Sequence, residues 1–353
     1  MIEVAKGNLL TAPVEALVNT VNTVGVMGKG IALQFKQAYP HMFREYERAC
    51  KAGEVRLGKM HIFDLGGLGG GPRWIINFPT KEHWRTASRL SAVEMGLKDL
   101  AVVIRRLNIH SIAVPPLGCG NGGLEWSDVK AKIETTLHDI PSVRIFIYAP
   151  IGAPSAAAMP NRTQRSKMTI GQAALIWLID RYLKGLLDPY VSLLEVHKLM
   201  YFLKAAGEPL PKLKFKKDRY GPYSPDLRHA LIRMEGHFIR GFGEGSDDPK
   251  IVLELLPGAI EAAKSFLTEF GDTKNRLAQV ESLIHGFEDP YGMELLSSVH
   301  WVMQHETPLC RDSLEAVISC VHHWSERKRR IMKPEHLKLA WKVLHKHSHF
   351  LDI

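Results

Sequence analysis

Glycine-spaced loops and one lysine are the residues of this 353-residue chain whose types and spacing fit chemistry on a phosphorylated ligand. The first loop lies in the stretch 18–35, VNTVNTVGVMGKGIALQF, where an apolar run ends at Asn19 and Asn22 and a helical pattern begins after Gly30. A strand that ends in glycines and restarts as a helix presents backbone N–H groups at the positive end of a helix dipole. We therefore predict that this stretch binds phosphate.

A second glycine loop, PPLGCGNGGL at 115–124, follows the apolar run 111–114, and two polar segments follow other predicted strands, GNLL at 7–10 and NFPTKEHWR at 77–85. The carboxyl ends of parallel strands meet at one edge of a sheet, where ligands of such folds bind. Two opposed glycine loops would hold a diphosphate from both sides through main-chain N–H donors, because glycine lets the backbone approach closely.

Each glycine signal also has a plainer interpretation. The GKG at 28–30 satisfies neither the dinucleotide-binding nor the P-loop motif, and a single glycine-rich loop is often only a tight turn. GGLGGG at 66–71 is predicted to be a flexible hairpin connection without a ligand. Cys119, between two glycines, suggests a nucleophile, but no base lies at a recognisable spacing, which favours a small residue that shapes the loop.

Lys81 lies at the exit of an apolar strand, and the residues alone leave open whether it is a counter-charge for phosphate or a catalytic group. A partly desolvated lysine beside another cation such as Arg85 has a lowered pKa and offers a neutral amine as nucleophile toward an aldehydic or anomeric carbon. His83 and Glu82 suit acid–base or metal roles, although a solvated helix start is the plainer interpretation. The histidines of the C-terminal tail are spaced too irregularly for a metal site.

Alternating strand and helix signals in the first 150 or so residues must position these groups. Strands are predicted at 1–4, 16–18, 60–63, 74–78, 111–114 and 143–148, and helices at 29–39, 42–50, 89–107 and 126–138. This alternation is typical of an α/β domain with a largely parallel sheet. We predict that this domain spans residues 1–152.

Residues 153–168 are rich in Pro, Ala and Ser without an apolar periodicity, and they are predicted to be a linker. The remainder, 169–353, is predicted to be mostly α-helical with little strand signal. Helices are expected at 170–187, 192–206, 227–233, 258–270, 275–283, 291–305 and 335–345.

Composition bounds the class of protein. The chain is long enough for two domains, and its 45% hydrophobic and 24% charged residues are typical of a soluble globular protein. Four scattered cysteines without a C-x-x-C pair indicate neither a disulfide framework nor a zinc site, so we expect a reducing cytoplasm. The N-terminus is not a signal peptide and no apolar run approaches the ~18–20 residues of a membrane span, so no membrane association is expected. A net charge of +9 favours a polyanionic substrate or partner.

The first domain resembles the macrodomains, an ADP-ribose-binding α/β/α fold, in GNLL, in VNTVNTVGVMGKGIALQF and in PPLGCGNGG. The segment INFPTKEHWR at 76–85 is similar to the macrodomain branch that removes ADP-ribose from DNA bases. The whole chain resembles the macrodomain antitoxins of DarT/DarG toxin–antitoxin systems. The resemblance implies an α/β macrodomain, an α/β/α sandwich with a mixed, largely parallel sheet, followed by a mostly α-helical domain.

The resemblance also implies roles for single residues. Lys81 matches the catalytic lysine that attacks the anomeric carbon of the distal ribose or stabilises an oxocarbenium-like charge, after which water completes hydrolysis. Asn22 matches the asparagine that faces this ribose. Some relatives carry Asp where this chain has Asn121, and an amide is not a general acid or base. No metal or cofactor is expected. The implied substrate-binding residues are Asn8 and Leu9 at the adenine end, Thr20, Val21, Asn22, Gly28, Lys29, Gly30, Ile31, Thr80, Leu117, Gly118, Cys119, Gly120, Asn121 and Gly122.

The implied substrate is DNA, single-stranded, with ADP-ribose on thymidine through an N-glycosidic bond. The basic charge suits DNA phosphates. Trp84 and Arg85 either stack on an unpaired strand, or Trp84 packs under a helix; the sequence leaves this open. A non-enzymatic reader of ADP-ribose is an alternative function.

In the second half, EVHKLMYFLKAAGE at 195–208 and FKKDRYGPYSPDLRHAL at 215–231 resemble a helical antitoxin module. The resemblance implies binding to a DarT-like DNA ADP-ribosyltransferase toxin, through the turn 220–223 and the basic run 214–217, both expected to be exposed. A dimerisation or folding module, or an antitoxin that acts by sequestration only, is the alternative. RKRRIMK at 327–333 suits nucleic acid, although a solvated helix end is preferred.

Overall fold

The computed structural model describes residues 1–67, 71–140, 142–152, 159–165, 167–185, 190–243 and 248–348. The chain divides into two compact units, Met1–Gln164 and Arg165–Ile353, within the segment predicted as a linker. On the first side of this division, Met159 packs against the core of the first unit, and the amide of Arg162 donates to the carbonyl of Gln37 at 2.8 Å.

The first unit contains a six-stranded sheet in the order β1-β6-β5-β2-β4-β3. Its neighbours pair in parallel except β3 and β4, which are antiparallel, so the predicted mixed and largely parallel sheet is confirmed. The antiparallel pairing of β3 with β4 confirms the predicted hairpin, whereas residues 68–70 of its predicted connection at 66–71 lie outside the described residues. The strands are β1 (Ile2–Ala5), β2 (Ala16–Asn22), β3 (His61–Asp64), β4 (Trp74–Lys81), β5 (Ser111–Val114) and β6 (Arg144–Tyr148).

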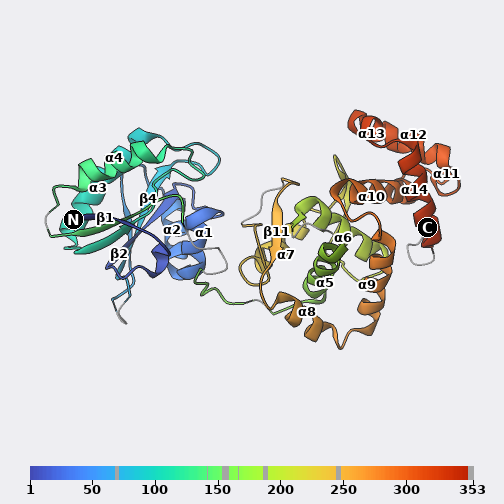
Figure 1. Cartoon of the computed structure of the whole chain (residues 1–353), viewed down its shortest axis with the longest axis horizontal. Coiled ribbons are helices and arrows are strands. Elements are labelled where there is room, and N and C mark those ends of the chain that lie inside the picture. The colour runs from blue at the N-terminus through green and yellow to red at the C-terminus, as the bar shows by residue number, and fades with distance from the viewer. Residues whose placement is uncertain are drawn as a thin grey trace. The chain divides into compact units, whose positions relative to one another are not determined.

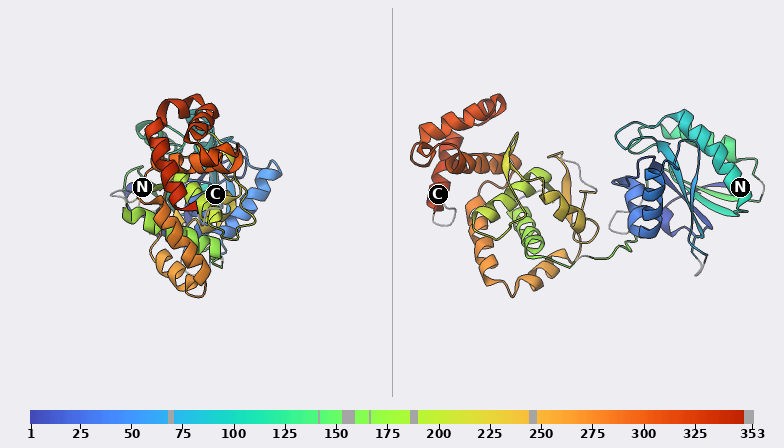
Figure 2. Two further views of the ribbon diagram at one scale, coloured as in Figure 1. Left: turned by 90° about the vertical axis from the view of Figure 1, so that its right-hand side faces the viewer. Right: turned by 180° about the vertical axis from the view of Figure 1, so that it is seen from behind.

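Two layers of helices cover this sheet (Figures 1 and 2). Helices α1 (Gly30–Ala38) and α2 (Pro40–Lys51) lie on one face, and α3 (Leu90–Arg106) and α4 (Trp126–Leu137) on the other. Side chains alternate between the two cores, as the period of a strand requires. Leu17 belongs to the core under α1 and α2, and Val18 to the core under α3 and α4. The predicted α/β/α sandwich is confirmed.

The second unit is mostly helical, as predicted. None of the described helices in either unit is long and apolar enough for a membrane crossing. Residues 186–187, where the first predicted helix ends, fall outside the described part of the chain. The helices are α5 (Ile170–Gly185), α6 (Leu193–Ala205), α7 (Leu227–Met234), α8 (Ala259–Leu267), α9 (Gly271–Ile284), α10 (Pro290–His305), α11 (Leu309–Asp312), α12 (Leu314–Trp324), α13 (Glu326–Ile331) and α14 (Pro334–Lys346).

Five short strands within the described residues of this unit have no counterpart in the sequence prediction. They form a three-stranded antiparallel sheet, β10-β11-β7, and the hairpin β8–β9. Strands of two to four residues are too short to show an alternation of apolar and polar side chains. They are β7 (Val191–Ser192), β8 (Lys216–Asp218), β9 (Gly221–Tyr223), β10 (Ile239–Arg240) and β11 (Val252–Leu255).

Candidate active site

The ends of β2 and β4 bring two predicted site residues side by side. The strands run in parallel, and their register shifts by one residue after Val21, so that Asn22 pairs with Lys81 rather than with Thr80. Irregular pairing of this kind re-aims side chains and is frequent next to active sites. The hydroxyl of Thr80, which is buried, donates to the carbonyl of Val21 at 3.4 Å and holds the shift in place.

The amine of Lys81 donates hydrogen bonds to two main-chain carbonyls, that of Asn121 at 3.1 Å and that of Trp84 at 3.3 Å. Burial lowers the pKa of Lys81 below its usual 10.5. The direction agrees with the sequence argument, but the cause is burial and not the charge of Arg85, whose guanidinium lies over the ring of Trp84 at 4.5 Å. Both acceptors of the amine are neutral, so neither stabilises its protonated form as a carboxylate would.

Asn22 braces the first loop in this structure. Its side-chain oxygen accepts from the amides of Val24 and Val26 at 3.0 and 3.3 Å, and its side-chain nitrogen donates to the carbonyl of Val26 at 2.5 Å. The hydroxyl of Tyr46 on α2 donates to the carbonyl of Asn22 at 2.6 Å. The loop is therefore held in shape from β2 on one side and from α2 on the other.

The first loop ends in main-chain donors that have no acceptor in the described part of the chain. They are the amides of Gly28, Lys29, Gly30 and Ile31. Helix α1 begins here without a side-chain cap, so these groups stand at its positive end. Gly30 has a φ of +60°, a conformation that favours glycine.

The second loop, 117–124, is a tight coil in which Gly122 leaves no room for a side chain. A Cβ on Gly122 would lie 2.3 Å from the carbonyl oxygen of Gly118 and 2.4 Å from Oγ of Ser88. The amide of Ser88 donates to the carbonyl of Gly122 at 2.9 Å, which fixes the loop against the start of α3. The amides of Gly120, Asn121 and Gly122 donate to no acceptor among the described residues.

Asn121 is where both loops and the lysine meet. A Cβ on Gly30 would lie 3.3 Å from Nδ2 of Asn121, and the carbonyl of Asn121 is 3.1 Å from Nζ of Lys81. Two loops whose main-chain donors have no acceptor among the described residues thus come together beside an amine of lowered pKa. This arrangement can bind a diphosphate and place an attached electrophilic carbon near the amine.

Cys119 fits the interpretation of a residue that shapes the loop rather than a nucleophile. Burial, together with the nearby charge of Glu125, raises the pKa of its thiol to about 11, so the thiolate is scarce near neutral pH. Its Sγ donates to the carbonyl of Leu117 at 3.6 Å, within the same loop.

The predicted residues at the adenine end lie apart from this meeting point. Asn8 follows β1, at the edge of the sheet, and its side chain accepts from the amide of Leu10 at 3.0 Å, capping the short 3₁₀ helix Leu9–Thr11. No hydrogen bond within the described residues joins Asn8 to the other segments. Thr20 is half-buried on β2. Three further predicted binding residues are buried: Leu9, Val21 and Leu117.

Two residues that support the site were not predicted from the sequence, Tyr46 and Ser88. Tyr46 follows Met42 at helical spacing and both are buried, so the pattern marks it only as a core residue. Ser88 is an isolated serine before α3 and carries no motif. Their roles depend on contacts with Asn22 and Gly122, 24 and 34 residues away in the chain.

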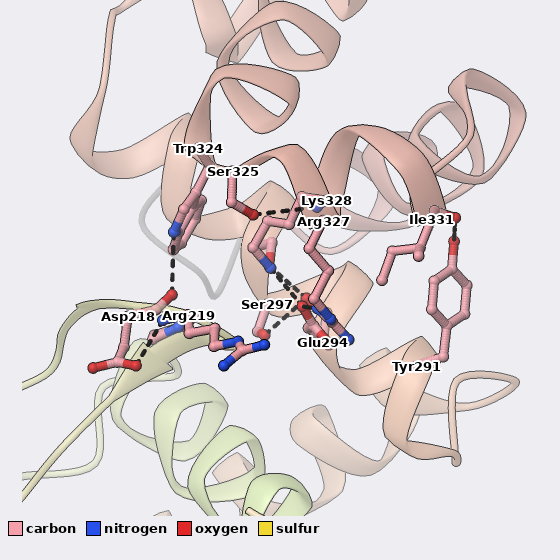
Figure 3. Close-up of polar contacts among 12 residues, drawn as sticks. Asp218, Arg219, Tyr291, Glu294, Ser297, Trp324, Ser325, Arg327, Lys328 and Ile331 are labelled. Atoms are coloured by element: carbon pink, nitrogen blue, oxygen red, sulfur yellow. Dashed lines mark hydrogen bonds and ion pairs between the residues drawn. The ribbon is translucent and has the colours of Figure 1, made fainter.

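The second unit carries an ionic cluster around a buried glutamate beside the β8–β9 hairpin (Figure 3). Glu294 on α10 accepts from Arg327 at 2.6 and 3.0 Å and from Lys328 at 2.7 Å. The indole of Trp324 donates to the carbonyl of Asp218, on β8, at 3.1 Å. The expected solvated helix end at 327–333 is therefore wrong for Arg327 and Lys328, since Lys328 is fully buried.

The turn 220–223 was expected to be exposed, and this is wrong for Gly221 and Pro222, which are buried. The amine of the buried Lys198 donates to the carbonyl of Pro222 at 2.8 Å and ties the hairpin to α6. Within the basic run, Lys214 and Lys216 are exposed, as predicted. The outward face of the hairpin is thus its first strand and the residues before it.

Known proteins resemble this chain in its first domain and along nearly its whole length. The family model described as Macro domain matches residues 18–133. A protein of Thermus aquaticus named DNA ADP-ribosyl glycohydrolase is 44% identical over 344 residues, which are 98% of this chain and 93% of the relative. The solved macrodomain of Mycobacterium tuberculosis DarG is 59% identical and covers 42% of this chain and 98% of that one, with a TM-score of 0.42. A Thermosipho africanus protein named as a fusion of DNA ADP-ribosyl transferase and DNA ADP-ribosyl glycohydrolase is 35% identical over 142 residues, 36% of this chain and 37% of the relative.

The similarity to the Thermus protein extends over nearly the whole of both chains and so includes both units, not the macrodomain alone. The chain belongs to the family of DNA ADP-ribosyl glycohydrolases.

Proposed function

We propose that this chain removes ADP-ribose from thymidine bases in DNA by hydrolysing the N-glycosidic bond, with Lys81 as the catalytic residue. The observation that carries the proposal is the meeting of the Lys81 amine with both glycine loops at Asn121. Membership in the glycohydrolase family supports the reaction and the DNA substrate.

In the proposed reaction, the loop amides at 28–31 and 120–122 bind the diphosphate, and Asn22 lies beside the distal ribose. The neutral amine of Lys81 attacks the anomeric carbon of that ribose, and the bond from this carbon to the thymine nitrogen breaks. The nitrogen keeps the electron pair and takes up a proton. Water then displaces the lysine from the anomeric carbon, which releases ADP-ribose and restores the amine. Because Asn121 has no acidic proton, we assign the proton transfers to water and to the amine itself.

The test is hydrolysis of an ADP-ribosylated single-stranded oligonucleotide by the full chain. Wild type should release ADP-ribose and restore the unmodified strand, and Lys81→Ala should lower kcat by at least about 100-fold. Lys98→Ala is a matched control, because Lys98 is an exposed lysine on α3. A folded wild type that binds ADP-ribose but leaves the oligonucleotide modified would support the alternative function, a non-enzymatic reader.

We also infer that the second unit binds a DNA ADP-ribosyltransferase partner. The Thermosipho relative, whose name joins a transferase to a glycohydrolase in one chain, supports such a pairing. The exposed Lys214 and Lys216 lie at a hairpin whose main-chain carbonyls accept hydrogen bonds from Trp324 and Lys198. A rigid cationic edge of this kind suits an acidic surface on a protein partner.

This second proposal is tested by binding of the full chain to the cognate transferase. Reversing two charges with Lys214→Glu and Lys216→Glu should weaken binding at least tenfold. The control replaces two exposed lysines of α14, Lys338→Glu and Lys342→Glu, with the same change in net charge. Equal loss in both double variants, or loss in neither, would remove the hairpin as the binding surface.

A further inference from the structure

The turn that follows Lys81 is held rigidly at the edge of the site. The amide and hydroxyl of Thr23 donate to the carbonyl of Glu82 at 3.1 and 2.9 Å, which joins the turn to the loop after β2. At its other end, the amide and hydroxyl of Thr86 donate to the carbonyl of His83 at 3.1 and 2.8 Å. The side chains that this turn presents are therefore displayed on a fixed backbone.

Those side chains form a run of planar groups. Trp84 is 42% exposed, so packing under a helix, the plainer of the two alternatives open from the sequence, is wrong. His83 stacks on it with ring centroids 5.4 Å apart and an angle of 28° between the planes. The guanidinium of Arg85 lies over the same indole at 4.5 Å. A large aromatic side chain left this exposed beside a reactive lysine suggests a ligand rather than a core role.

We propose that His83, Trp84 and Arg85 form a stacking platform for a nucleobase that neighbours the ADP-ribosylated thymine on the same DNA strand. Aromatic rings and guanidinium planes both stack on unpaired bases with little sequence preference. Arg85 adds a positive charge for the adjacent phosphate. The platform favours a single strand, because the bases of a duplex are already stacked on one another. This inference rests on the proposed glycohydrolase function.

The platform is connected directly to the catalytic amine. The carbonyl of Trp84 accepts from Nζ of Lys81 at 3.3 Å, so the residue that stacks on the base also helps to orient the lysine. A strand seated on the turn would therefore be held in register with the reacting carbon. The consequence is a preference for modified oligonucleotides over a modified nucleoside, which lacks the neighbouring base.

The experiment compares two substrates, an ADP-ribosylated single-stranded oligonucleotide and ADP-ribosylated thymidine, with the full chain. Trp84→Ala should lower kcat/KM for the oligonucleotide about tenfold more than for the nucleoside, the size expected for one stacked base. Trp84→Phe, which keeps an aromatic face, should recover most of this difference. Arg85→Ala should reduce the dependence of oligonucleotide hydrolysis on salt.

The same strand offers a matched control. At the amino end of β4, the guanidinium of Arg73 lies over the ring of Trp74 at 4.5 Å, the same pair of residues as Arg85 and Trp84 beyond its carboxyl end. Arg73→Ala should leave the ratio of the two substrates and the salt dependence unchanged.

Two results would overturn the platform. In one, Trp84→Ala slows both substrates equally, which would mean that Trp84 only supports Lys81. In the other, Trp84→Ala changes neither substrate. Failure of the proposed function is separate, because wild type would then hydrolyse neither the oligonucleotide nor the nucleoside. Melting temperatures of the variants show whether each one is folded.

Discussion

Lys81 owes its chemical character to partial burial, with no counter-ion among the residues that the structure describes. Its amine contacts two neutral carbonyls, and burial lowers its pKa below the usual 10.5. A lysine in this setting gives up its proton more readily than a surface lysine and so has a larger share of neutral, nucleophilic amine at a given pH.

If neutral Lys81 is the nucleophile, kcat/KM should rise with pH and level off above the pKa of the free enzyme, at a midpoint below 10.5. The sign follows from the charge: deprotonation creates the reactive form, so activity is gained as the pH rises. Initial rates on a modified oligonucleotide between pH 6 and 10 measure this. Lys81→Arg, which stays protonated throughout, should be inactive across the range. A profile that is flat or falls with pH would contradict a neutral amine.

The residues that could be predicted from the sequence are those whose chemistry is local. Lys81 stands out at the end of an apolar strand, and Cys119 lacks a base nearby. Tyr46 and Ser88 could not be predicted, because their contribution is a hydrogen bond to a residue that is close only in the folded chain. Whether Trp84 is exposed or packed could not be predicted for the same reason, since its exposure depends on the turn around it.

The helices and strands predicted for the first unit are right in type, but the two strands that lead to the site were predicted too short. β2 was expected to end at Val18 and continues to Asn22, and β4 was expected to end at Phe78 and continues to Lys81. The polar residues at these ends look like loop in the sequence, yet they remain paired with each other. Pairing between strands, which no local pattern reveals, places Asn22 opposite Lys81.

In the second glycine loop, Gly122 and Gly120 should respond differently to substitution by alanine. Gly122→Ala should lower the free energy of unfolding by about 1–3 kcal/mol and weaken ADP-ribose binding, because its Cβ meets the backbone of Gly118 at 2.3 Å. Gly120→Ala should leave stability within about 0.5 kcal/mol, since nothing lies within 4 Å of a Cβ there. Denaturant unfolding and calorimetric titration with ADP-ribose measure both. Equal stability of the two variants would show that the loop yields to a side chain.

The hairpin of the second unit gives a prediction about pH and stability. Burial, together with the charge of Lys328, lowers the pKa of Lys198 to about 7. Between pH 7 and 10 the unfolded chain holds this proton and the folded chain does not, so the contribution of Lys198 to stability rises with pH. Relative to Lys198→Met, wild type should gain unfolding free energy as the pH rises through this window. A difference that stays constant with pH would show that Lys198 keeps its proton in the folded state.

The two units have separate hydrophobic cores. The buried clusters of the first unit share no residue with that of the second. The residues proposed for hydrolysis all lie in the first unit, and those proposed for binding the transferase lie in the second.

This separation predicts that residues 1–164 fold alone and hydrolyse ADP-ribosylated oligonucleotide with a kcat within about threefold of the full chain, whereas 165–353 bind the transferase without hydrolysing DNA. The physical reason is that each unit buries apolar residues in a core of its own, and no buried residue of one core belongs to the other. Circular dichroism, thermal melts and the oligonucleotide assay on both fragments test it. A folded fragment 1–164 that hydrolyses only after 165–353 is added back would show that the second unit completes the active site.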